Sequence, residues 1–176
     1  PDYDAAWNNI GIIFFDRGKL DEAIEAFENA ITINPHNAGA HYSLGAALTY
    51  QNKMREAKQY YKKAIKIKPD LADAHWNLSG TADNIKEAMN ILKRCLKVDP
   101  NRLDAKLTLS ALQYYEGDEQ NFNSLIESSL KDHPSMRSFS WAFSLPSLPE
   151  LFFYRWALFD RMIEISKKKR PFYEFG

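Results

Sequence analysis

The sequence predicts an all-α protein built from stacked pairs of antiparallel helices. Its prolines at 1, 35, 69, 100 and 134 follow one another at intervals of 34, 34, 31 and 34 residues. The runs before Pro35 and Pro69 are helical in pattern, and each ends in a polar residue. Because proline cannot continue a helix, each proline marks a stop. Regular spacing on this scale predicts an internal repeat of helical hairpins.

The composition supports a packed protein and excludes several classes of partner. Of the 176 residues, 45% are hydrophobic and 14% are aromatic, which is enough apolar surface for a core. The formal charge is zero, so no global field draws the chain to nucleic acid or membrane. No apolar run reaches the roughly 18 residues of a membrane span. The single cysteine, Cys95, leaves no disulfide framework, and we expect a cytoplasmic protein.

The four segments between the prolines carry similar residue types in the same order. Each has a large residue, then an apolar residue followed directly by glycine or serine, then further apolar or small residues, and a proline near its end. Residues 4–37 carry Trp7, Ile10, Gly11, Phe14, Ala23, Phe27, Ala30 and Pro35. Residues 38–71 carry His41, Leu44, Gly45, Leu48, Ala57, Tyr61, Ala64 and Pro69. Residues 72–102 carry His75, Leu78, Ser79, Ala88, Leu92, Cys95 and Pro100. Residues 103–136 carry Lys106, Leu109, Ser110, Gln113, Phe122, Ile126, Ser129 and Pro134.

This pattern resembles the tetratricopeptide repeat family, strongly in the first two segments, well in the third and in degenerate form in the fourth. The resemblance implies a right-handed superhelix of hairpins over residues 1–136, with repeats at 4–37, 38–71, 72–102 and 103–136. Small residues such as Gly11 and Gly45 recur where the two helices of a hairpin meet. One hairpin cannot bury both of its faces, so neighbouring hairpins must stack.

The third repeat is three residues shorter than the others, and the shortfall lies around residues 80–84. We therefore expect its first helix to be about one turn shorter. The same shortfall predicts a local bend or an opening in the groove of the superhelix.

After Pro134 the period is lost, and residues 137–170 are expected to form capping or linking helices. The apolar run 150–168 ends in basic residues, which favour the end of a helix. Residues 171–176 resemble the opening of the first motif of class I S-adenosylmethionine-dependent methyltransferases, in which Glu174 and Gly176 fall on the motif. This resemblance implies that the chain is a piece cut near the start of a second domain.

In the tetratricopeptide family, the first helix of each hairpin lines a concave, peptide-binding groove. Carried onto this sequence, the resemblance implies a groove lined by Asn8, Asn9, Ile12, Phe15, Tyr42, Thr49, Tyr50, Trp76, Asn77, Leu107, Tyr114 and Tyr115. Side-chain amides can pair with a peptide backbone, and aromatic side chains are common anchors at interfaces. The other interpretation is that these aromatics pack inside the superhelix or against the C-terminal helix.

The leading functional prediction is a protein-interaction module that holds a protein or an extended peptide, with no catalytic residue, cofactor or metal. His41 and His75 occupy equivalent positions, but no third ligand is spaced nearby, which favours a packing role. Co-chaperone modules grip a C-terminal carboxylate with Lys, Asn and Arg. Here Asn8 lacks those basic partners, which argues against a receptor for Hsp70 or Hsp90 tails.

Two further interpretations remain open from the sequence alone. The first is the substrate-recruiting repeat region of a methyltransferase whose catalytic domain lies beyond Gly176. The second is a scaffold that self-associates through exposed repeat ends. The basic run 167–170 lacks the interleaved aromatics typical of RNA binding, so no nucleic-acid partner is expected.

Overall fold

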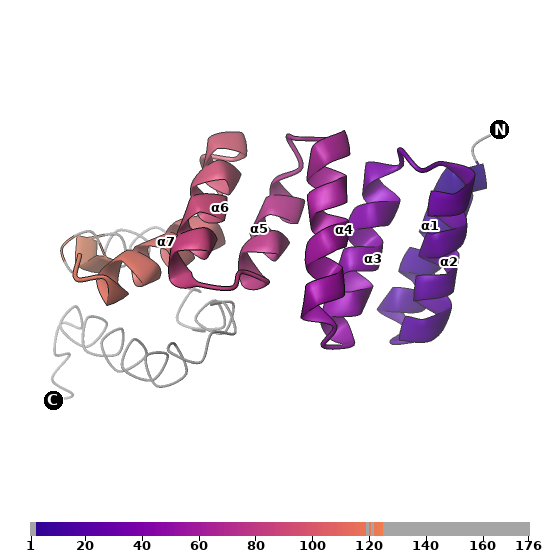
Figure 1. Cartoon of the computed structure of the whole chain (residues 1–176), viewed down its shortest axis with the longest axis horizontal. Coiled ribbons are helices and arrows are strands. Elements are labelled where there is room, and N and C mark those ends of the chain that lie inside the picture. The colour runs from indigo at the N-terminus through magenta and orange to yellow at the C-terminus, as the bar shows by residue number, and fades with distance from the viewer. Residues whose placement is uncertain (1–2, 119, 121, 125–176) are drawn as a thin grey trace, which may run out of the picture.

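The computed structural model describes residues 3–118, 120 and 122–124. Within these residues it contains seven α-helices and no strand. The helices are α1 (Tyr3–Asp16), α2 (Leu20–Ile33), α3 (Ala38–Tyr50), α4 (Met54–Ile67), α5 (Ala72–Gly80), α6 (Ile85–Val98) and α7 (Leu103–Tyr115). Figure 1 shows them side by side in a row, with α1 and α2 at one end and α7 at the other.

The row is a stack of antiparallel hairpins. Helix α1 packs on α2, α3 on α4 and α5 on α6, and each second helix also packs on the first helix of the next hairpin. The predicted all-α solenoid of helical hairpins is therefore confirmed. The predicted capping helices at 137–170 and the methyltransferase-like end at 171–176, with Glu174 and Gly176, lie outside the described residues.

Glycine sets the spacing of the first two hairpins. A Cβ atom built on Gly45 would lie 2.7 Å from the ring of Tyr61, and one built on Gly11 would lie 2.4 Å from the ring of Phe27. Both rings are fully buried. Because no real Cβ atom approaches another atom so closely, only glycine lets the aromatic ring of the second helix lie flat against the first.

The third hairpin differs as its sequence predicts. Helix α5 has 9 residues where α3 has 13, a difference of about one turn. In place of that turn the chain makes a short loop, which Thr81 closes by donating to the Leu78 carbonyl at 2.8 Å. Asn84 then caps α6, because its side-chain oxygen accepts the Glu87 N–H at 2.8 Å.

A buried lysine ties this loop to the preceding hairpin. Lys58 Nζ, on α4, lies 2.6 Å from a carboxylate oxygen of Asp83 and 3.0 Å from one of Glu87. Burial alone would lower the pKa of Lys58, but these two bonds outweigh it and raise the pKa above its ordinary value. The ammonium therefore stays charged while it bridges α4 and the start of α6.

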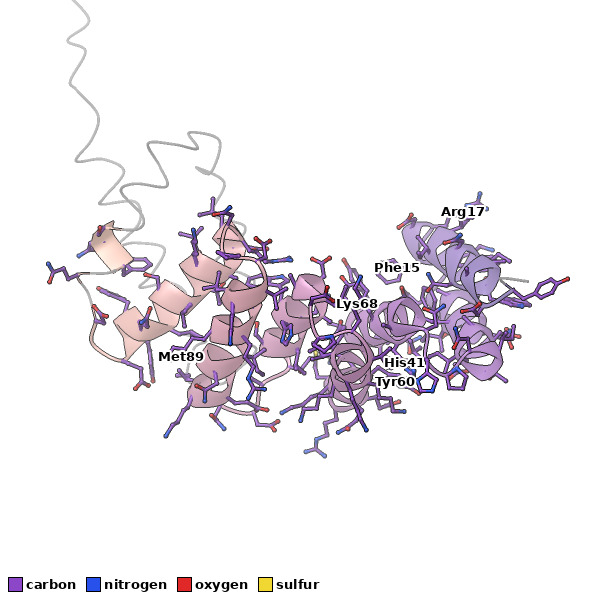
Figure 2. The ribbon with its side chains drawn as sticks, turned by 90° about the horizontal axis from the view of Figure 1, so that it is seen from above. Phe15, Arg17, His41, Tyr60, Lys68 and Met89 are labelled. Atoms are coloured by element: carbon purple, nitrogen blue, oxygen red, sulfur yellow. The ribbon has the colours of Figure 1, made fainter. Side chains whose placement is uncertain are left out.

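The two histidines secure the connections between hairpins. His41 Nε2 donates to the carbonyl of Pro35 at 2.9 Å, and His75 Nε2 donates to that of Pro69 at 3.0 Å. The His41 ring also stacks on Tyr60 with centroids 6.0 Å apart, and the pair is visible in Figure 2. Each imidazole is buried and bonds the proline that ends the preceding repeat, which is the packing role expected from the sequence.

Candidate functional site

The predicted groove residues all lie on the first helices of the hairpins. Helix α1 carries Asn8, Asn9, Ile12 and Phe15, α3 carries Tyr42, Thr49 and Tyr50, α5 carries Trp76 and Asn77, and α7 carries Leu107, Tyr114 and Tyr115. The face formed by these helices is called the groove face below. Figure 2 shows Phe15 on one side of the row of helices and the His41–Tyr60 pair on the other.

The structure brings four of the predicted residues together around one pocket. This α3–α5 pocket has a volume of about 260 Å³. Its predicted members are Thr49, Tyr50, Trp76 and Asn77. The pocket lies where α5 ends early, at Gly80. The three residues missing from the third repeat therefore account for both the shorter helix and the pocket.

Hydrogen bonds fix the polar wall of the pocket. Asn77 Nδ2 donates to the Tyr42 hydroxyl at 3.2 Å. Thr49 Oγ1 donates to the Gly45 carbonyl at 2.9 Å, so the Tyr61 hydroxyl is the donor in its own 2.9 Å bond with Thr49 Oγ1. Burial raises the pKa of Tyr61 to about 12, which keeps this phenol protonated. These hydrogen bonds within the protein thus hold the wall in place.

An arginine holds the aromatic wall. The Arg102 guanidinium lies 5.4 Å from the centroid of the Trp76 ring, a cation–π contact. Arg102 is itself fixed by Asp73 and by Asp104, whose carboxylate oxygen lies 3.0 Å from Nε. Partial burial opposes the charge, but the bonds to the two carboxylates raise the pKa of Arg102. The Trp76 ring is therefore supported on one face, with its indole still bordering the pocket.

The predicted residues of α1 lie at varied depths. Phe15 and Tyr50 meet edge to face, with centroids 5.0 Å apart, and 73% of Tyr50 is exposed. Asn9 is exposed, whereas Asn8 is half-buried and its Oδ1 has no hydrogen-bond partner within the described residues. Ile12 is exposed on α1. These side chains extend the groove face beyond the pocket toward the first hairpin.

Helix α7 contributes less surface than the repeat register suggested. Leu107 is a core residue with 0% exposure and offers nothing to a ligand in this arrangement. Tyr114 is half-buried and packs against Phe122 with ring centroids 4.9 Å apart. Tyr115 is exposed. Of the three predicted α7 residues, Tyr115 therefore presents the most surface.

Sequence reasoning missed several members of the site. The pocket is completed by Met54 and Tyr61 of α4 and by Gly80 and Thr81 at the end of α5. The family pattern assigns groove positions to first helices, so α4 residues were not considered. The short third repeat was the signal that could have identified Gly80 and Thr81. Nothing in the repeat pattern points to Arg102, which is the last residue of the third repeat and directly precedes α7.

The cysteine lies buried in α6. Burial raises the pKa of the Cys95 thiol to about 11, and its sulfur donates to the Ala72 carbonyl. Within the described part of the chain, no cluster of three or more metal-ligating side chains occurs. No helix there has both the length and the apolar character needed to cross a membrane.

Two models of repeat families match the sequence. A TPR repeat model matches residues 11–49, and a tetratricopeptide repeat model matches residues 38–71. Together they cover the α1–α2 and α3–α4 hairpins from Gly11 onward. Comparison with curated proteins finds no relative that matches the sequence.

Solved structures share the architecture. MamA matches with a TM-score of 0.69 at 19% identity, covering 95% of this chain and 90% of its own. YrrB, described as a TPR protein with an unusual peptide-binding site, matches at 0.67 and 17%, covering 93% and 86%. The first TPR domain of Spaghetti (RPAP3), bound to the HSP90 peptide SRMEEVD, matches at 0.63 and 19%, covering 66% and 94%. Residues 11–71 therefore match tetratricopeptide repeat models, and the described residues share the helical solenoid fold of these solved proteins.

Proposed function

We propose that the chain binds an extended peptide or protein segment along the groove face, with one apolar side chain of the ligand held in the α3–α5 pocket. The observation that carries the proposal is the convergence of Tyr50, Trp76 and Asn77 on one pocket. Aromatic side chains fixed beside a few polar groups are typical of interaction anchors.

The rigidity of the walls supports this function. Trp76 is held by Arg102, and Asn77 by Tyr42, so little side-chain freedom is lost when a ligand docks. Tyr50 is mostly exposed and contacts Phe15 by its edge, which leaves it able to close over a bound side chain. Amide groups of Asn77 and of Asn9 can pair with the backbone of an extended ligand.

Two proteins of similar fold are consistent with such a role. Spaghetti (RPAP3) has a peptide bound, and YrrB is described by its peptide-binding site. Arg102, the cation beside the pocket, is already paired with two carboxylates. We therefore propose that the chain recognises its ligand by one side chain and by the ligand's backbone. A C-terminal carboxylate is therefore not the expected anchor.

The test is selection from a random peptide library displayed on phage, followed by calorimetry on the selected peptides. Trp76→Ala is expected to weaken binding by at least ten-fold, because it removes an aromatic anchor. Asn77→Ala is expected to weaken binding by about three- to ten-fold, the equivalent of a hydrogen bond. The matched control is Lys93→Ala, which truncates an exposed side chain on α6 outside the pocket.

Unchanged circular dichroism of each variant would show that the loss belongs to the ligand contact and not to the fold. The proposal fails if the library yields no specific peptide. It also fails if the selected peptides bind Trp76→Ala and the parent chain equally well.

A further inference from the structure

Charge is segregated along the second helices of the hairpins, although the chain as a whole is neutral. Helix α2 carries Asp21, Glu22, Glu25 and Glu28 and no basic residue. Helix α4 carries Arg55, Lys58, Lys62, Lys63 and Lys66 against Glu56. Helix α6 carries Lys86, Lys93, Arg94 and Lys97 against Glu87. The zero net charge is therefore the sum of opposite local charges, with an acidic α2 and strongly basic helices α4 and α6.

Part of this basic charge surrounds a cleft. The cleft between α4 and α6, called the α4–α6 cleft, has a volume of about 620 Å³. Lys62 borders it from α4, and Lys86 and Arg94 border it from α6. Leu78 and Ile91 supply apolar surface between them. The cleft thus combines cations with an apolar floor.

The cleft and the α3–α5 pocket lie on opposite faces of α5. His75 and Leu78 line the cleft, whereas Trp76, Asn77 and Gly80 line the pocket. Residues three or four apart share one face of a helix, so these two sets point in different directions. A ligand in the α4–α6 cleft would therefore occupy a surface separate from the proposed peptide groove.

The carboxylate at the cleft is already neutralised. Glu87 pairs with Lys58 at 3.0 Å and also accepts the backbone N–H of Asp83 at 2.8 Å. Lys62, Lys86 and Arg94 are exposed and make no ion pair with the residues that the structure describes. Three cations thus face solvent around a cleft whose acidic residue is bound internally.

We propose that the α4–α6 cleft is a second binding site, which takes an acidic polypeptide segment with an aliphatic side chain among its carboxylates. The carboxylates pair with Lys62, Lys86 and Arg94, and the aliphatic group covers Leu78 and Ile91. Complementary charge steers such a segment to the cleft and fixes its orientation there.

The lining favours a polypeptide over a nucleic acid. Single-stranded nucleic acids bind by stacking bases on aromatic side chains. Among the described residues around the cleft, His75 is the only ring, and its Nε2 is bonded to the Pro69 carbonyl. The cleft therefore offers bases no stacking platform, whereas its apolar floor suits Leu or Ile.

The experiment uses the full 176-residue chain and a fluorescein-labelled peptide of repeating Glu-Glu-Leu units, followed by fluorescence anisotropy at low and at physiological salt. Binding is expected at low salt and weakens as salt rises. Lys62→Glu/Arg94→Glu is expected to weaken binding by about ten-fold, because two attractive contacts become repulsive. Arg17→Glu/Lys53→Glu changes the net charge equally at exposed sites away from the cleft and is expected to leave affinity within about two-fold.

Four results would overturn the proposal. The first is an absence of binding. The second is equal weakening by both charge-reversal variants, which would indicate only a general charge attraction. The third is weakening by Trp76→Ala, which would place the acidic peptide in the groove. The fourth is tighter, Lys62-dependent binding of a single-stranded oligothymidylate of matched charge, which would assign the cleft to phosphate.

Discussion

The second and third hairpins solve the same packing problem in different ways. In α3–α4, Gly45 lies directly against the Tyr61 ring, and the helices run at full length. In α5–α6, the equivalent positions hold Ser79 and Leu92, and α5 is one turn shorter. Because Leu92 is smaller than Tyr61, the third hairpin has room for the Ser79 side chain where the second hairpin requires glycine. The missing turn is replaced by a capped loop that leaves a pocket beside it.

The comparison shows which contacts a repeat must keep and which it can exchange. The buried interface between the two helices of a hairpin is kept, because Leu92 and Tyr61 are both fully buried. The length of the first helix can change, because α5 has lost its last turn and a loop takes its place. That loop needs stabilising contacts of its own. Lys58 provides that stabilisation from the neighbouring hairpin, so the irregular repeat depends on the regular one.

The largest difference is expected at the glycine position. Gly45→Ala places a Cβ atom 2.7 Å from the Tyr61 ring and should reduce the free energy of unfolding by about 2 kcal/mol. Ser79→Ala, at the equivalent position of the third hairpin, should cost less than about 1 kcal/mol, because it removes only the bond that Ser79 Oγ donates to the Trp76 carbonyl at 2.6 Å. Urea denaturation of both variants measures the contrast. Equal losses would show that the two hairpins are not packed differently.

The next effect concerns the lysine that joins the hairpins. Lys58→Met keeps the apolar stem but removes the bonds to Asp83 and Glu87, and should destabilise the chain by about 1–2 kcal/mol. Hydrogen exchange should quicken at the N–H groups of residues 81–87 in particular. Lys93→Met, at an exposed position of α6, is the control and should change neither quantity. Unchanged exchange in Lys58→Met would mean that the loop is self-supporting.

The cap of α6 should contribute a smaller amount. Asn84→Ala removes the acceptor for the Glu87 N–H and should cost about 1 kcal/mol, whereas Asn84→Asp keeps that acceptor and should cost less. Thermal unfolding followed by circular dichroism compares the two variants. A larger loss for Asp than for Ala would contradict the capping role.

The smallest expected effect is a dependence of the Lys58 contribution on pH. The bond from Lys58 lowers the pKa of Asp83, and the Asp83 N–H, together with Lys58, lowers that of Glu87. A carboxylate with a lowered pKa stabilises the fold above its unfolded pKa and loses that contribution as pH falls through the folded value. The difference in melting temperature between parent and Lys58→Met should therefore be steady near neutral pH and shrink below about pH 4. A difference that persists unchanged at lower pH would contradict this account.

The sequence predicted the fold better than the site, for a physical reason. Residues such as Gly11 and Phe27 recur with the repeat because every hairpin must bury the same interface, so their register can be read from spacing. The early end of α5 was also predictable, because the missing residues had to come from one helix or its loop. Such constraints act locally and leave a periodic record.

The rest depends on contacts that occur once, at a single junction between hairpins, and such contacts leave no periodic record. Lys58 of α4 binds Asp83 of the next hairpin, and Arg102, just before α7, supports Trp76 of α5. Neither pairing recurs in the other hairpins that the structure describes. Leu107 was expected on the groove face from its repeat position but lies in the core. The fourth repeat matches the family pattern least well, so position counting is least informative there.

The central claim is that a peptide ligand occupies the α3–α5 pocket, and the indole resonances of the tryptophans test it most directly. The chain has four tryptophans, and Trp7 lies on exposed surface of α1 outside the pocket. A peptide selected from the library is titrated into ¹⁵N-labelled protein, with Trp76→Phe and Trp7→Phe used to assign the signals. We predict a saturating shift of the Trp76 indole N–H, with the Trp7 signal unchanged. Binding that shifts Trp7 and leaves Trp76 in place would contradict the account.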